Sequence, residues 1–164
     1  MLYPVTEENC VFYFETETGN KVSVEFTELT DAFEAVFPIY CVDIYNKVVS
    51  NSRANDLSGS ATRDTIVSII RHFFDKFDCA LVAFIDTSTD HKGRARHRLF
   101  KSWFTTFASE DFIIEPREVF VSGSESYSLL IIRKSYGNTA MIIDEFDKFI
   151  RLANTPNGEG ENLP

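Results

Sequence analysis

The chain has 164 residues, 44% of them hydrophobic, and carries a formal net charge of -9 at pH 7. This length and composition predict one globular domain with a sizeable core and exclude a disordered chain. No apolar run approaches the ~18–20 residues of a membrane-spanning helix, and the first residues show no secretory signal, so we expect a cytoplasmic protein with no membrane partner.

Three strands are predicted in the first third of the chain. Apolar and polar residues alternate over 11–26, which predicts a β-hairpin. Gly19 and Asn20 are expected to supply the positive φ angles of its turn. Residues 37–49 suit a third strand, with Pro38 at the beginning, where no ladder hydrogen bond is lost.

The middle of the chain predicts a loop, a helix and a buried strand. Residues 50–61 are polar and rich in Ser, Asn and Gly, which is typical of a loop. A helix is expected over 63–77, with Thr62 as N-cap and Asp64 in the first turn. The nearly continuous apolar run 79–86 predicts a strand in the interior of a sheet.

The last third predicts a helix, a strand pair and a further helix. The first helix is expected over 94–108, the strands over 112–122 and 126–134, and the last helix over 139–153. Residues 154–164 are polar, and we expect a flexible C-terminal tail.

These elements give the order β-β-β-α-β-α-β-β-α in a single domain over 1–153. The order predicts an α+β fold, a mixed sheet of about six strands with three helices packed on it. Pro116 within the strand 112–122 suggests that this strand lies at an edge of the sheet or contains a bulge. The three cysteines, Cys10, Cys41 and Cys79, lack zinc spacing and are expected to be buried free thiols.

Positive charge is concentrated in one short segment of this acidic chain. Residues 91–101 hold five of the 16 basic side chains and none of the 25 acidic ones. The remainder is therefore strongly acidic and is expected to repel long nucleic acids, whereas contact with one phosphate or with an acidic patch of a protein partner stays possible.

One arginine of this segment is expected to point inward. The predicted helix carries an apolar stripe of Leu99, Phe100, Trp103, Phe104 and Phe107. Arg94, Arg98 and Lys101 fall away from the stripe and are expected to be solvated. Arg96 lies almost at the centre of the stripe, one turn before Leu99, close to the end of the strand 79–86.

A half-buried guanidinium needs a partner. The partner can be Asp86 or Asp90, or it can be an external phosphate or carboxylate bound by Arg96 and the N–H groups of the helix start. Both can coexist, because arginine has five donors. The candidate anion site consists of Arg96, Arg94, Lys92, Thr87, Ser88 and Gly93.

Catalytic alternatives are also open. His97 or His91 could act as a general base, with Asp86 as a further acid–base candidate. The element order is similar to that of RNase H-like enzymes, in which Glu15 or Glu17, Asp64 and Asp86 would hold divalent metal ions, but on a helical wheel Asp64 falls opposite the core stripe. No phosphate-loop or dinucleotide motif is present, and no cofactor is expected.

Several segments carry a resemblance to a known family: YFETETGNKVSVEF (13–26), TIVSIIRHFF (65–74), FIDTSTD (84–90), RARHRLFKSWF (94–104) and SLLIIRK (128–134). Over about residues 10–150 the chain resembles an uncharacterised bacterial family, a domain of unknown function found in Bacteroidota-type genomes. The most specific element is Arg-x-Arg-Leu-Phe after an Asp-ended strand. The resemblance implies a bacterial accessory protein, a setting in which toxin–antitoxin and phage-defence components are common.

Two functions are therefore expected as alternatives. The first is an interaction or regulatory protein, such as one component of a toxin–antitoxin or phage-defence pair, with an anion-binding site at the start of the second helix. The second is an enzyme with a phosphate-containing substrate, nuclease-like or nucleotide-modifying, in which Arg96 stabilises charge and Asp86 or His97 acts as acid or base.

Overall fold

The computed structural model describes residues 1–31, 33, 35–47, 59–86, 92–121 and 124–154, and of residues 86, 120–121 and 124–125 only the backbone. In chain order the elements are β1 (Thr6–Glu8), β2 (Val11–Glu15), β3 (Lys21–Glu28), β4 (Ile39–Lys47), α1 (Ser60–Lys76), β5 (Ala80–Asp86), α2 (Gly93–Ser102), a π-helical turn (Trp103–Phe107), β6 (Phe112–Val121), β7 (Ser124–Arg133) and α3 (Thr139–Ala153). The predicted α+β class and mixed sheet are confirmed.

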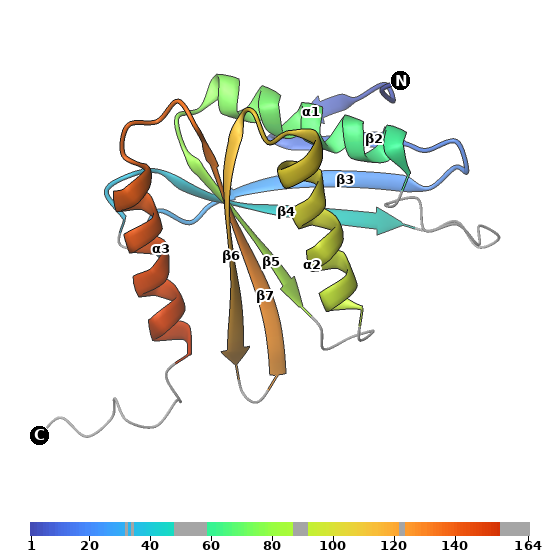
Figure 1. Cartoon of the computed structure of the whole chain (residues 1–164). Coiled ribbons are helices and arrows are strands. Elements are labelled where there is room, and N and C mark those ends of the chain that lie inside the picture. Colours follow the sequence, from blue (N-terminus) through green and yellow to red (C-terminus); the bar gives the residue numbers. More distant parts are fainter. Residues whose placement is uncertain (32, 34, 48–58, 87–91, 122–123, 155–164) are drawn as a thin grey trace, which may run out of the picture.

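The seven strands form one sheet in the order β1-β2-β3-β4-β5-β7-β6. Every neighbouring pair is antiparallel except β4 and β5. These two are parallel because α1 carries the chain back across the sheet between them. The sheet is strongly twisted, so that β6 and β7 run across the direction of β3 and β4 (Figure 1).

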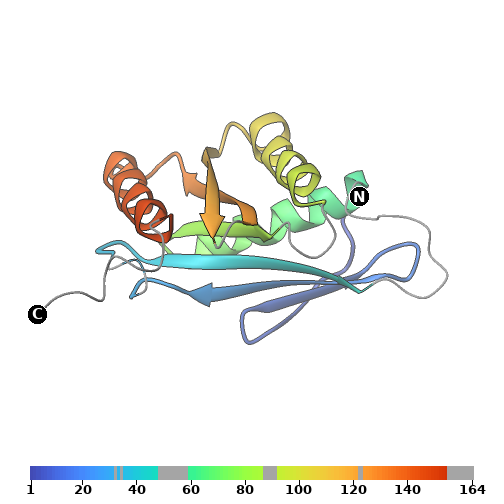
Figure 2. The same cartoon turned by 90° about the horizontal axis from the view of Figure 1, so that it is seen from below.

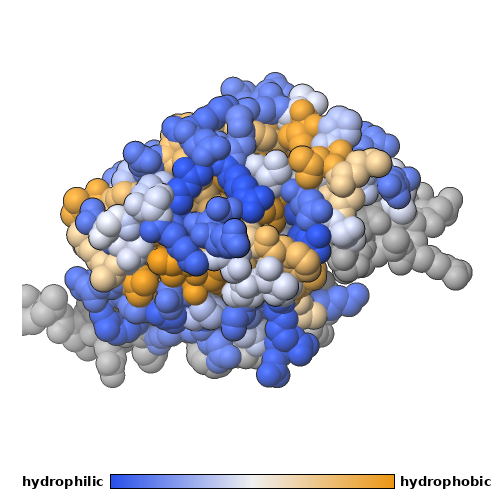
Figure 3. Space-filling view, turned by 45° about the horizontal axis from the view of Figure 1, so that its top comes forward, coloured by the Kyte–Doolittle hydropathy of each residue, from blue (hydrophilic) through white to orange (hydrophobic). Residues whose placement is uncertain are grey.

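Helices cover both faces of the sheet, but unequally. One apolar cluster joins β2–β5 and β7 to α1, α2 and the π-helical turn; its largest fully buried side chains include Trp103, Phe73 and Phe74. A second cluster joins β4–β7 to α3 through Ile142, Phe146 and Ile150. In Figure 2, α2 and α3 stand on either side of β6 and β7. The visible surface in Figure 3 is mostly hydrophilic, with apolar side chains in separate patches.

The sequence-based prediction missed β1. This edge strand has three residues, all exposed, which is too short to show an alternating pattern. It joins β2 through a turn in which Asn9 and Cys10 have φ angles of 51° and 62°, as a tight hairpin turn requires. In the next hairpin only Gly19 has a positive φ, 82°, so the prediction for Asn20 was wrong. Asn20 is buried, and its N–H donates to Thr16 Oγ1.

Two helix boundaries also differ from the predictions. Gly59, not Thr62, is the N-cap of α1. Asp64 therefore lies beyond the first turn, where it pairs with Arg63 at 2.7 Å. The helix predicted to Ala108 changes to a π-helical turn after Ser102. The wider turn shifts the direction of its last side chains relative to an α-helix, and Phe107 emerges half-exposed, with the Arg63 guanidinium 3.5 Å from its ring centroid.

Other expectations agree with the structure. The strand β5 lies in the interior of the sheet, and Pro116 lies in β6, the strand at one edge. Cys41 and Cys79 are buried free thiols, whereas Cys10 is half-buried in the first turn. The predicted tail, residues 154–164, falls outside the described residues apart from Asn154. No helix within the described ranges is long and apolar enough to span a membrane.

An ion pair between Arg117 and Asp147 predicts a pH-dependent contribution to stability. Arg117 Nε and Nη2 donate to Asp147 Oδ1 and Oδ2 at 2.7 and 3.2 Å, which ties α3 to β6. Hydrogen bonding from Arg117 lowers the pKa of Asp147. A carboxylate with a lowered folded pKa stabilises the fold above its unfolded pKa of about 3.9 and loses this effect as pH falls through the folded value.

Asp147→Asn should therefore lower the free energy of unfolding at pH 7 by less than ~1 kcal/mol, because solvent screens this partly exposed pair. Urea denaturation at pH 7 and at about pH 2 measures the difference between the variant and the unmodified chain. The difference should disappear at the lower pH. If Asp147→Asn lowered the free energy of unfolding by the same amount at both pH values, the pH-dependent contribution would not come from the Arg117–Asp147 ion pair.

Candidate ligand-binding cleft

The parallel strands β4 and β5 separate after three residue pairs. They are in register from Ile39 opposite Ala80 to Cys41 opposite Val82. Beyond this point β4 stays paired with β3 up to Lys47, and β5 stays paired with β7. No strand pairing among the described residues joins 42–47 to 83–86, so the two strand edges that face each other diverge.

A cleft of about 570 Å³ fills the space between the diverging strands. Its walls are two strand segments, 42–46 and 83–85, and two side chains of α2, Arg96 and Phe100. Val42 belongs to the core under α1 and α2, and Ile44 packs against it. Because side chains alternate along a strand, Asp43 and Tyr45 lie on the opposite face, and the cleft reaches both faces of the sheet.

The basic segment divides as its helical spacing predicts. Arg96 is half-buried and lines the cleft, whereas Arg94, Arg98 and Lys101 are exposed. Gly93, the first residue of α2, is buried. The first turn of α2 carries no acidic residue, and Lys92, the N-cap, makes no side-chain capping bond. Positive charge from the helix start and from Arg96 therefore adds up on this side of the cleft.

The opposite side of the cleft is acidic and aromatic. The Cys41 thiol, at the point where the strands separate, donates to Asp43 Oδ2 at 3.6 Å. Burial, together with the nearby Asp43 charge, raises the pKa of Cys41 to about 12, which leaves it an unreactive thiol. Asp43 also raises the pKa of Tyr45, with a smaller effect of burial. Phe84 is 40% exposed beside them.

His97 lies behind the cleft rather than in its wall. Its ring stacks on Tyr127 of β7, with 4.7 Å between the ring centroids. Burial, and after it the charge of Lys101, lowers the pKa of His97. The imidazole is therefore neutral at pH 7, but it is not among the residues that line the cleft.

Several predicted site residues cannot be placed against the cleft. Thr87, Ser88, Asp90 and His91 lie outside the described residues, as does the side chain of Asp86, the last residue of β5. The structure places Arg96 beside the diverging ends of β4 and β5. The sequence analysis did not predict that Ile44, Asn46 and Phe84 would line a site. The sequence of a strand carries no signal of where its neighbour diverges.

The carboxylates of the RNase H-like alternative are not brought together. Glu15 extends from β2 on the face away from α1, whereas Asp64 belongs to α1. The strand that ends at Asp86 is three positions from β2 in the sheet, a separation of about 14 Å at the usual strand spacing. No group of three or more His, Cys, Asp or Glu side chains within the described part of the chain could hold a metal ion.

A buried polar atom beside the cleft yields a stability prediction. Asn46 Oδ1 is buried and has no hydrogen-bond partner in the described structure. Leaving such a group unsatisfied costs ~1–3 kcal/mol. Asn46→Leu should therefore raise the free energy of unfolding, measured with urea, by about 1 kcal/mol.

The exposed position Thr27 on β3 gives a control. Thr27→Val should change the free energy of unfolding by less than ~0.5 kcal/mol. If Asn46→Leu instead destabilises the protein, Asn46 has a structural partner and is not available to a ligand.

Comparisons with known proteins match the chain to a family and to a distantly similar structure. The crystal structure of Arabidopsis thaliana NAA60 in complex with acetyl-CoA is similar to this chain, with 11% sequence identity, a TM-score of 0.41 and 79% of each chain covered. No curated protein matches the chain significantly in sequence. A model of a family of unknown function, DUF6169, matches residues 59–148, more than half of the chain. The chain therefore belongs to the DUF6169 family of unknown function.

Proposed function

We propose that the protein binds an extended small ligand, one that carries amide groups and a phosphate or carboxylate, in the cleft between β4 and β5. The observation that carries this proposal is the divergence of the two parallel strands after Cys41 and Val82. The chain is in this view a binding and regulatory protein.

The facing strand edges supply the amide-binding part of the site. Backbone N–H and C=O groups at a strand edge need partners, and within the described residues no strand pairing joins 42–47 to 83–86. An extended molecule with amides can hydrogen-bond along both edges in the manner of an added strand. Apolar side chains such as Ile44 and Phe100 line the space for its aliphatic parts.

Arg96 and the start of α2 supply the anion-binding part. A guanidinium binds a phosphate or carboxylate through two parallel hydrogen bonds, and Arg96 lines the cleft on the α2 side. Asp43 on the opposite side disfavours a second anionic group there. This polarity predicts that the ligand lies with its anionic end toward α2.

The lining of the cleft favours binding over hydrolysis. None of its described residues is a histidine, cysteine or serine, and Asp43 is the one carboxylate among them. The enzymatic alternative requires turnover of a phosphate-containing ligand that depends on Asp86 or His97.

The exposed cations of α2 support a second role as a protein-binding face. Lys92, Arg94, Arg98 and Lys101 are exposed on one helix of a chain with net charge -9. An acidic patch on a partner would complement them. We include in the proposal the cellular role expected from the resemblance, a cytoplasmic bacterial accessory protein of a toxin–antitoxin or phage-defence pair.

Calorimetry with three probes tests the cleft. Phosphopantetheine combines two amides in an extended chain with a terminal phosphate, pantetheine lacks the phosphate, and inorganic phosphate lacks the chain. Phosphopantetheine should bind at least about tenfold more tightly than either part, because each part retains only some of the contacts. Equal affinity for phosphopantetheine and phosphate would show that the strand edges do not bind the amide chain. No binding of phosphopantetheine at millimolar concentration would overturn the proposal. Release of phosphate during the titration would select the enzyme.

A further inference from the structure

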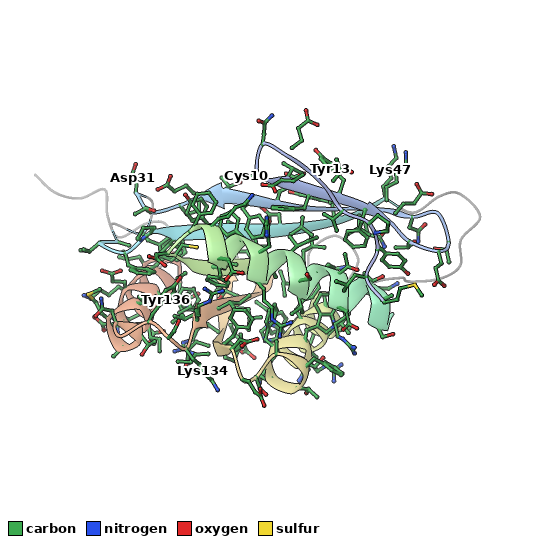
Figure 4. The ribbon with its side chains drawn as sticks, turned by 90° about the horizontal axis from the view of Figure 1, so that it is seen from above. Cys10, Tyr13, Asp31, Lys47, Lys134 and Tyr136 are labelled. Carbon is green, nitrogen blue, oxygen red and sulfur yellow. The ribbon has the colours of Figure 1, made fainter. Side chains whose placement is uncertain are left out.

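A second hollow lies on the face of the sheet away from α1. We name it the sheet groove; it has a volume of about 520 Å³, and its lining includes Tyr13, Glu15, Lys21, Ser23, Tyr45 and Lys47. Figure 4 shows Tyr13 and Lys47 on this side of the sheet, with α1 on the other. The groove does not depend on the cleft proposed above, although Tyr45 lines both.

Two exposed tyrosines flank a small residue in this groove. The register places Tyr13, Ser23 and Tyr45 side by side on β2, β3 and β4. Tyr13 is 44% and Tyr45 55% exposed. Two strand spacings separate them by about 9.6 Å, and Ser23 is too small to fill the space between the rings. Stacked aromatic rings have centroids about 4.5–7 Å apart, so a ring between two others needs about 9 Å or more, and the space between Tyr13 and Tyr45, the tyrosine notch, can take one aromatic ring system.

Two lysines meet at the end of the same groove. Lys21 of β3 is directly opposite Lys47 of β4, an arrangement that is unfavourable for like charges. Within the described structure no carboxylate oxygen lies within 4.0 Å of either ammonium group. Glu15 is opposite Lys21 on its other side, so the position for an anion is between the two lysines, over β3 and β4.

The lysine pair and the tyrosine notch have a fixed separation. Lys21 and Ser23, like Lys47 and Tyr45, are two residues apart on one strand, which is about 6.8 Å. A ligand that uses both features therefore has an aromatic ring system about 7 Å from its phosphate or carboxylate. A nucleoside monophosphate has these proportions.

From this juxtaposition we propose that the sheet groove binds a small aromatic anion, with its ring between Tyr13 and Tyr45 and its anionic group between Lys21 and Lys47. Charge complementarity supports this occupant, because the lysine pair is a local positive site on an acidic protein. Because the two hollows share Tyr45, a ligand in the groove would lie next to a ligand in the cleft.

Calorimetry at low and moderate salt with adenosine monophosphate, adenosine and ribose 5-phosphate tests the proposal. The complete nucleotide should bind more tightly than either fragment, and its affinity should fall as salt rises. Lys47→Met and Tyr13→Ala should each weaken nucleotide binding by about 5- to 30-fold, from the loss of a charge-assisted bond or of a stacking partner. Lys148→Met on α3 removes an exposed lysine elsewhere and should leave binding unchanged.

The outcomes separate the groove from the cleft. Arg96→Gln should leave nucleotide binding by the groove unaltered, because Arg96 lines the cleft and does not line the groove. Thermal unfolding of each variant shows whether it is folded. The proposal would be overturned if the folded, unmodified protein did not bind the nucleotide, or if Lys47→Met and Tyr13→Ala bound it as tightly as the unmodified protein does. Either result would count whatever the outcome for phosphopantetheine.

Discussion

Arg96→Gln should weaken the binding of phosphopantetheine by about 10- to 100-fold, because a hydrogen bond to a charged group contributes ~1.5–3 kcal/mol. Arg96 is the one cation among the described residues that line the cleft. Glutamine keeps much of the length and polarity of the side chain but loses the charge and the paired donors. Calorimetry measures the change, and the affinity for pantetheine, which lacks the anion, should stay nearly the same.

Arg98→Gln is the matched control for this prediction. Arg98 lies on the same helix two residues later, but it is exposed and does not line the cleft. The variant has the same change in net charge, so any effect of long-range electrostatics would appear in both. If the two variants lose affinity equally, the anion is attracted by the basic segment as a whole and Arg96 has no specific role.

Phe73→Ala should lower the free energy of unfolding by about 3–5 kcal/mol, the usual cost of removing a large buried ring. Phe73 of α1 is 1% exposed. Its ring stacks on Phe26 with 3.9 Å between centroids and meets Tyr40 edge-on at 5.2 Å. Tyr40 is opposite Leu81 in the short parallel pair, so the same substitution removes support from the point where the cleft begins.

Phe107→Ala gives the comparison for an exposed ring. Phe107 is 53% exposed, and its described ring contact is with the Arg63 guanidinium. Loss of this contact in Phe107→Ala should lower the free energy of unfolding by ~0.5–1 kcal/mol. Urea denaturation measures both variants. A loss below about 1.5 kcal/mol for Phe73→Ala would show that α1 contributes less to this core than the packing indicates.

The predictable part of the fold comes from periodicity and composition. The alternation over 11–26 correctly predicted which side chains of β2 and β3 are buried, because burial is periodic in a regular element. The same reasoning correctly predicted that Arg96 is partly buried whereas Arg94 and Arg98 are exposed. The boundaries were less accurate, because Gly59 replaced Thr62 as the N-cap of α1 and a π-helical turn moved Phe107 out of the stripe.

The cleft itself could not be predicted. Ile44 and Phe84 have ordinary strand patterns around them, and the divergence of β4 from β5 depends on the twist of the whole sheet and not on either sequence. The sheet groove could not be predicted either, because it depends on the register between neighbouring strands. Lys21 and Lys47 are 26 positions apart in the chain, and only the pairing of β3 with β4 places them opposite each other.

Amide chemical shifts and hydrogen exchange, measured by NMR with and without phosphopantetheine, show whether the diverging strands bind the ligand. We expect shift changes and slower exchange at amides within 42–47 and 83–85, on the two edges that face each other. The outer edge of β1, which is also an edge strand, should not change. Changes confined to β1, or to the start of α2 with none in β4 and β5, would contradict the proposal that the diverging strands hold an extended ligand.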